Sequence, residues 1–132
     1  MLFVKSYLAG LVAFLIIDFV WLKYIALGFY RSHIGHLMTD KPNLVVAGLF
    51  YLFYVVGVVI LAVYPALEKQ SWAIAAIYGG LLGLVAYGTY DITNLATLKS
   101  WPPIVTIVDM IWGTVLTASV ATISYFVTAA MR

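Results

Sequence analysis

One short stretch, YGTYDITNLATLKSW at residues 87–101, gathers polar side chains in a chain otherwise rich in valine, leucine, alanine and isoleucine. Tyr87, Tyr90, Asp91 and Asn94 recur at spacings of three and four, so a helix presents them on one face. A carboxylate beside phenol and amide groups can hold a cation or exchange a proton. It can also form a closed hydrogen-bonded network that only fixes the packing of the helices.

Two further carboxylates stand in apolar stretches, and each precedes a tryptophan by three residues: Asp18 with Trp21, and Asp109 with Trp112. At this spacing the carboxylate and the indole share one face of a helix. Ionisable groups within a membrane usually have a function, so ligand binding or proton relay is expected for these carboxylates. The two tryptophans are expected to form pocket walls, although interfacial anchoring is the commoner use of tryptophan near membrane boundaries.

Several kinds of chemistry are not expected. The chain has no cysteine, and its two histidines, His33 and His36, lack further clustered ligands, so neither a metal nor another cofactor is predicted. No nucleophile-elbow, zinc-protease or phosphate-binding motif is present. A formal net charge of +2 is too small to indicate a nucleic-acid partner.

The composition places these residues in a membrane. Of the 132 residues, 65% are hydrophobic and only 9% are charged, against about a quarter charged in soluble domains. Four apolar stretches are long enough to cross a hydrocarbon core of about 30 Å as helices. We therefore expect an all-α, polytopic membrane protein with a single transmembrane domain over residues 1–132 and a retained first helix. The expected helices cover residues 6–28, 44–64, 73–98 and 103–128.

The connections between these stretches are short, so consecutive helices should be antiparallel neighbours in a four-helix bundle. The first connection contains FYRSHIGHLM, whose apolar residues recur at helical spacing, and a short interfacial helix is expected there. Lysine and arginine are almost evenly divided between the two sides of the membrane, so the orientation is left open.

Depth along the helices brings the polar residues together. At about 1.5 Å per residue, Asp18, Tyr51, Tyr54, Asp91 and Asp109 all lie roughly 10 to 15 Å below the surface that carries the first and third loops. A polar pocket opening towards those loops is expected. Its predicted ligand-binding or proton-relay residues are Asp18, Tyr51, Tyr54, Tyr87, Tyr90, Asp91, Asn94 and Asp109.

The other half of the third helix carries a G-x-x-x-G pair, Gly79 and Gly83. Small residues at this spacing let two helix backbones approach closely in a membrane. Homo-oligomer formation through this pair is therefore expected.

Six segments resemble a known family. They are DFVWL at 18–22, FYRSHIG at 29–35, FYLFYVVG at 50–57, YPAL at 64–67, YGTYDITNLATLKSWP at 87–102 and VDMIWGTVLT at 108–117. Over nearly the whole chain, the sequence is similar to the DUF2177 family of bacterial membrane proteins. The resemblance implies a four-helix, multi-pass protein of the bacterial inner membrane, and it implies no particular activity or catalytic residues.

Three functions follow from the acidic, tyrosine-lined pocket. The favoured one is binding or transport of a small molecule or cation, with proton exchange at the carboxylates, because carboxylate charge and aromatic faces attract cations. The alternative is a membrane enzyme or accessory factor acting on lipid, with Asp91 or Asp109 as general acid or base. The third is a non-catalytic assembly partner. A non-enzymatic role is favoured, with the lipid bilayer as the surrounding partner.

Overall fold

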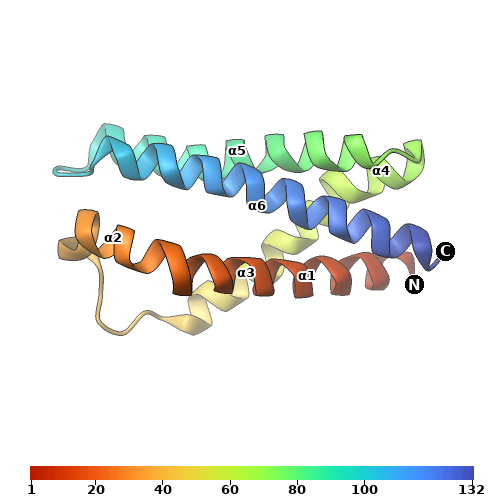
Figure 1. The fold of residues 1–132 in the computed structure, drawn as a ribbon, viewed down its shortest axis with the longest axis horizontal. Helices are drawn as coiled ribbons and strands as arrows, with labels where there is room; N and C mark the ends of the chain where they lie inside the picture. The colour runs from red at the N-terminus through yellow and green to blue at the C-terminus, as the bar shows by residue number, and fades with distance from the viewer.

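The computed structural model describes residues 1–132 and is entirely helical. Its four long apolar helical stretches, each long enough to cross a membrane, run alternately in opposite directions (Figure 1). The predicted all-α, antiparallel four-helix class is therefore confirmed. The four stretches are Leu2–Leu37, Leu44–Lys69, Trp72–Thr97 and Pro103–Ala130.

The first stretch is one continuous helix. It consists of α1 (Leu2–Trp21), a π-helical turn η1 (Leu22–Ala26), α2 (Leu27–Ile34) and a final 3₁₀ turn η2 (Gly35–Leu37). The surface helix expected in the first loop is thus the end of the first membrane helix, because no proline interrupts the chain before Pro42. At 36 residues this helix is about 54 Å long, so its last turns extend beyond a hydrocarbon core of about 30 Å.

The second stretch also contains a π-helical turn. It runs through α3 (Leu44–Val58), η3 (Val59–Val63) and α4 (Tyr64–Lys69). Asn43 begins it as a cap, because its side-chain oxygen accepts a hydrogen bond of 3.1 Å from the Val46 amide. The last two stretches are the uninterrupted helices α5 (Trp72–Thr97) and α6 (Pro103–Ala130).

Helices α5 and α6 pack closely together, because two glycines of α5 face α6 and leave no side chain between the backbones. A Cβ atom added to Gly79 would lie 2.8 Å from the Ala121 side chain, and one added to Gly83 would collide with the carbonyl group of Gly113. Both glycines are buried. The expectation that this pair joins two copies of the chain is wrong, because α6 of the same chain already covers it.

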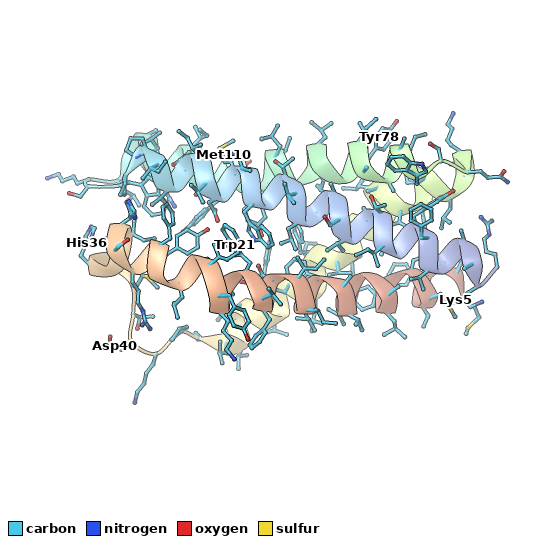
Figure 2. The ribbon with its side chains drawn as sticks, viewed as in Figure 1. Lys5, Trp21, His36, Asp40, Tyr78 and Met110 are labelled. Atoms are coloured by element: carbon cyan, nitrogen blue, oxygen red, sulfur yellow. The ribbon has the colours of Figure 1, made fainter.

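The bundle is packed tightly towards the chain termini and loosely towards the first and third loops. Ser6 and Thr128 share a buried hydrogen bond of 3.0 Å at the terminal end, and Lys5 lies there beside the C-terminus (Figure 2). The only buried residues of α3 are Val55 and Val58, in its second half. Its first half leaves space between the helices, and the candidate site lies in that space.

Candidate functional site

A cavity of about 500 Å³, the larger of two adjoining inner cavities, is lined mainly by aromatic side chains and lies between α1, α3, α5 and α6. It contains one carboxylate, four tyrosines and two phenylalanines. Its lining residues are Phe14, Phe50, Tyr51, Tyr54, Ala86, Tyr87, Tyr90 and Asp109.

Packing and one hydrogen bond fix the aromatic wall on the α1 and α3 side. The ring of Phe14 lies 5.3 Å from that of Tyr51 and 6.0 Å from that of Tyr54, measured between centroids. The Tyr54 hydroxyl makes a 2.8 Å hydrogen bond with the Thr117 hydroxyl of α6. These contacts hold two tyrosines at the edge of the cavity.

The opposite wall depends on a glycine. The ring of Tyr87 rests directly on Gly113 of α6, where any Cβ atom would collide with three atoms of that ring. Gly113 is therefore needed for Tyr87 to lie where it does.

A second, smaller cavity of about 170 Å³ adjoins the first at the loop end of the bundle. Both cavities are lined by Tyr90 and Asp109, and the smaller one also by Asp91. Its full lining is Tyr30, Ile34, Met38, Tyr90, Asp91, Trp101, Val105 and Asp109.

The two carboxylates of the smaller cavity have different surroundings. Asp91 is fully buried, and neither of its carboxylate oxygens has a hydrogen-bond partner. Asp109 is only partly buried, and its Oδ1 atom accepts a hydrogen bond of 2.6 Å from the Tyr30 hydroxyl. One acid is thus satisfied within the chain and the other is not.

The backbone around Asp91 is held by the loop that joins α5 to α6. The indole N–H of Trp101 donates to the Thr106 hydroxyl at 2.9 Å. That hydroxyl donates in turn to the Asp91 main-chain oxygen at 3.2 Å. Trp101 and Thr106 are both buried, so this chain of bonds fixes the end of α5 against α6.

The two D-x-x-W motifs meet because α1 and α6 are antiparallel. The rings of Trp21 and Trp112 stack with centroids 4.3 Å apart and planes 7° from parallel, and Trp21 points from α1 towards α6 in Figure 2. The Trp112 indole donates to Oδ1 of Asp18 at 3.3 Å. The Trp21 indole N–H is buried and has no acceptor.

The structure does not gather the predicted residues into one pocket. Asp18 lines neither inner cavity; it lies in a largely apolar groove beside α1, which Tyr51 also lines. Asn94 is half-buried and lines none of the cavities described. The stacked Trp21 and Trp112 line neither inner cavity. The residues brought together are Tyr51, Tyr54, Tyr87, Tyr90 and Asp109 in the larger cavity, and Tyr90, Asp91 and Asp109 in the smaller.

Several lining residues escaped the sequence analysis. Tyr30 lies in FYRSHIG, which was assigned to a surface helix. Had the first membrane helix been extended through residue 37, Tyr30 would have been a candidate lining residue. Phe14 and Phe50 carry no polar group and are typical of any membrane helix. Trp101 follows the expected end of the third helix, where tryptophan commonly lies at the membrane interface, yet it is 7% exposed.

No lysine, arginine or histidine lines either cavity. Lys23 lies over the rings of Phe19 and Tyr24, and His33 makes a 2.9 Å hydrogen bond with the main-chain oxygen of Phe29. The chain also contains no group of three or more side chains placed to hold a metal ion. The carboxylates of the two cavities are therefore not paired with a cation of the chain.

Comparison with known proteins gives one match. A family model described as "Predicted membrane protein (DUF2177)" matches residues 3–126. None of the curated proteins and none of the solved structures compared with the chain matches it.

Proposed function

The chain belongs to the DUF2177 family of predicted membrane proteins, and we propose that it binds a monovalent organic cation in the larger aromatic cavity, against Asp109. The observation that carries this proposal is one carboxylate among six aromatic side chains in a cavity of about 500 Å³. Cavities of this size suit small organic molecules. The bacterial inner membrane, which the family resemblance implies, is the proposed location.

Charge and aromatic faces act together in this cavity. An aromatic ring attracts a cation at its face with about 0.5 to 2 kcal/mol, more when water is excluded. A carboxylate within a membrane is expensive unless a positive charge pairs with it. Since no cationic side chain lines the cavity, a bound cation would supply that charge.

The shape of the cavity favours a ligand that arrives from the lipid. The first half of α3 contributes no buried residue, and α3 makes hardly any contact with α5. Phe50 of α3 and Tyr90 of α5 are 59% and 55% exposed although both line the cavity. An apolar cation dissolved in the bilayer would therefore enter sideways, between α3 and α5.

Transport is the second part of the proposal. A cation that enters from the lipid and leaves when a proton takes its place would cross the membrane at the expense of the proton gradient. The carboxylates that would exchange the proton are those of the two inner cavities.

The same sideways opening also favours a second candidate function, an enzyme or accessory factor acting on lipid. Asp109 would then act as general acid or base, and Tyr90 would donate to a headgroup or carbonyl oxygen. Deleting the gene should then alter the lipid profile of the cells. Complementing the deletion strain with Asp109→Asn should leave that altered profile unchanged. An unchanged profile in the deletion strain would exclude this candidate.

Calorimetric titration of the purified chain in detergent tests cation binding. Tetraphenylphosphonium and tetraphenylborate have the same shape and opposite charge, so only the first should bind. Asp109→Asn should weaken binding by at least about 30-fold, because losing one partner of a buried charge pair costs about 2 kcal/mol or more. Asp40→Asn makes the same chemical change in the exposed first loop (Figure 2) and should have no effect. Equal binding of both ions would contradict the proposal, as would unchanged binding to Asp109→Asn.

A further inference from the structure

Asp91 is a buried acid, and the proposed cation binding at Asp109 does not explain why it is there. It is 0% exposed, lines the smaller cavity, and neither of its carboxylate oxygens has a hydrogen-bond partner. Buried polar groups almost always have partners, so each exception calls for a cause.

The groups that face Asp91 supply no positive charge. The titratable side chains around the smaller cavity are Tyr30 from α2, Tyr90 from α5 and Asp109 from α6, and the remaining lining residues are apolar. An ionised carboxylate in such surroundings carries a large desolvation penalty, and it avoids that penalty by binding a proton.

Asp109 differs from Asp91 in its hydrogen bonding. The Tyr30 hydroxyl donates a hydrogen bond of 2.6 Å to the Asp109 Oδ1 atom. No donor reaches either carboxylate oxygen of Asp91.

We propose that Asp91 is a proton-binding site coupled through Asp109 to the cation in the larger cavity. The coupling rests on the proposed function; the proton site itself does not. A cation beside Asp109 neutralises the charge that opposes ionisation of Asp91. The O–H bond of the Asp91 carboxylic acid then breaks, its electron pair stays on the carboxylate, and the proton passes to water.

The position of the smaller cavity decides where the proton goes. Met38 of the first loop and Trp101 of the third loop line it, at the end of the bundle where His36 and Asp40 lie (Figure 2). Its volume of about 170 Å³ exceeds the roughly 30 Å³ share of one water molecule. The proton therefore leaves towards the side of the first and third loops.

Linkage makes the effect reciprocal. If the cation lowers the proton affinity of Asp91, then protonation of Asp91 lowers the affinity for the cation by the same factor. Cation binding should release up to one proton per cation and should strengthen as the pH rises.

Infrared spectroscopy of the full chain in detergent, with no ligand added, tests the proton site. A protonated carboxyl group gives a carbonyl band that ionised carboxylates lack, and the band shifts in heavy water. We expect this band in the wild type, in Asp40→Asn and in Asp109→Asn, and its loss in Asp91→Asn. Absence of a shifting band in the wild type, or its full retention in Asp91→Asn, would overturn the proposal. Loss of the band when sodium chloride is added to a salt-free sample would overturn it too, by making the site a sodium site.

Proton release on adding tetraphenylphosphonium, followed in weak buffer with a pH indicator, tests the coupling. The wild type should release protons. Asp91→Asn should bind the cation within about threefold of the wild type and release none, because asparagine has the shape of the neutral acid. Unchanged release from Asp91→Asn, or loss of binding as severe as in Asp109→Asn, would overturn the coupling. If the wild type binds no cation, the proposed function and the coupling both fail, and the infrared band still decides the proton site.

Discussion

Gly113→Ala tests whether the wall of the larger cavity is as closely packed as the structure indicates. The added Cβ atom would collide with three atoms of the Tyr87 ring, so the ring must move into the cavity. Overpacking of this kind costs about 1 to 3 kcal/mol. Replacing a glycine inside a helix by alanine also gains about 0.5 to 1 kcal/mol, whatever surrounds it.

Gly57→Ala isolates that gain, since nothing lies within 4 Å of a Cβ atom added to Gly57. The two variants should therefore differ in the free energy of unfolding by the overpacking cost alone, about 1 to 3 kcal/mol. Unfolding in mixed micelles, followed by circular dichroism, measures this difference. Cation affinity should also fall about fivefold in Gly113→Ala, because a displaced Tyr87 loses a cation–π contact of about 1 kcal/mol. Equal stability of the two variants would refute the packing of Tyr87 on Gly113.

Two aromatic pairs give further predictions. Trp112→Phe should lower the free energy of unfolding by about 0.5 to 1.5 kcal/mol, because it removes the hydrogen bond to Asp18. Trp21→Phe removes an indole N–H that has no acceptor and should lower it less. A larger loss in Trp21→Phe than in Trp112→Phe would contradict the hydrogen bond from Trp112 to Asp18. Tyr54→Phe should cost about 1 kcal/mol through its bond to Thr117. Tyr51→Phe is the control, because it removes a hydroxyl from the same cavity wall without breaking a hydrogen bond to another side chain. Equal free energies of unfolding for the two tyrosine variants would argue against the hydrogen bond between Tyr54 and Thr117.

The sequence was sufficient for the architecture because membrane helices follow from length and composition. Helix starts at 44, 73 and 103 were expected, and the helices begin at Leu44, Trp72 and Pro103. The first helix is longer than expected, because no proline interrupts the chain before Pro42 and the helix continues to Leu37. The polar residues of FYRSHIG indicated an end at residue 28, and Tyr30 was therefore assigned to a surface helix.

The candidate site was predictable in depth but not in direction. Depth depends only on the count of residues from a helix end, and Asp91 and Asp109, which that count places at similar depth, line the same cavity. Rotation about the helix axis depends on packing against neighbours, and it places Asp18 against Trp112 of α6, outside both inner cavities. The same limit applies to Gly79 and Gly83: their spacing indicates a close helix contact, and only the structure identifies α6 as the partner.

The two D-x-x-W motifs lead to a last prediction. The antiparallel pairing of α1 and α6 brings their tryptophans into contact, but their two carboxylates accept hydrogen bonds from different donors. Asp18 accepts the Trp112 indole, whereas Asp109 accepts the Tyr30 hydroxyl and faces both inner cavities. We therefore expect Asp18→Asn to lower the free energy of unfolding by about 1 kcal/mol, by weakening a charge-assisted bond, and to leave cation affinity within about threefold of the wild type. Asp109→Asn should instead lower cation affinity by at least about 30-fold. Calorimetry and unfolding experiments on the two variants measure these effects, and a larger loss of affinity in Asp18→Asn than in Asp109→Asn would show that the groove beside α1, and not the larger cavity, holds the cation. The two motifs thus differ in position, because Asp109 lines both inner cavities and Asp18 lines neither.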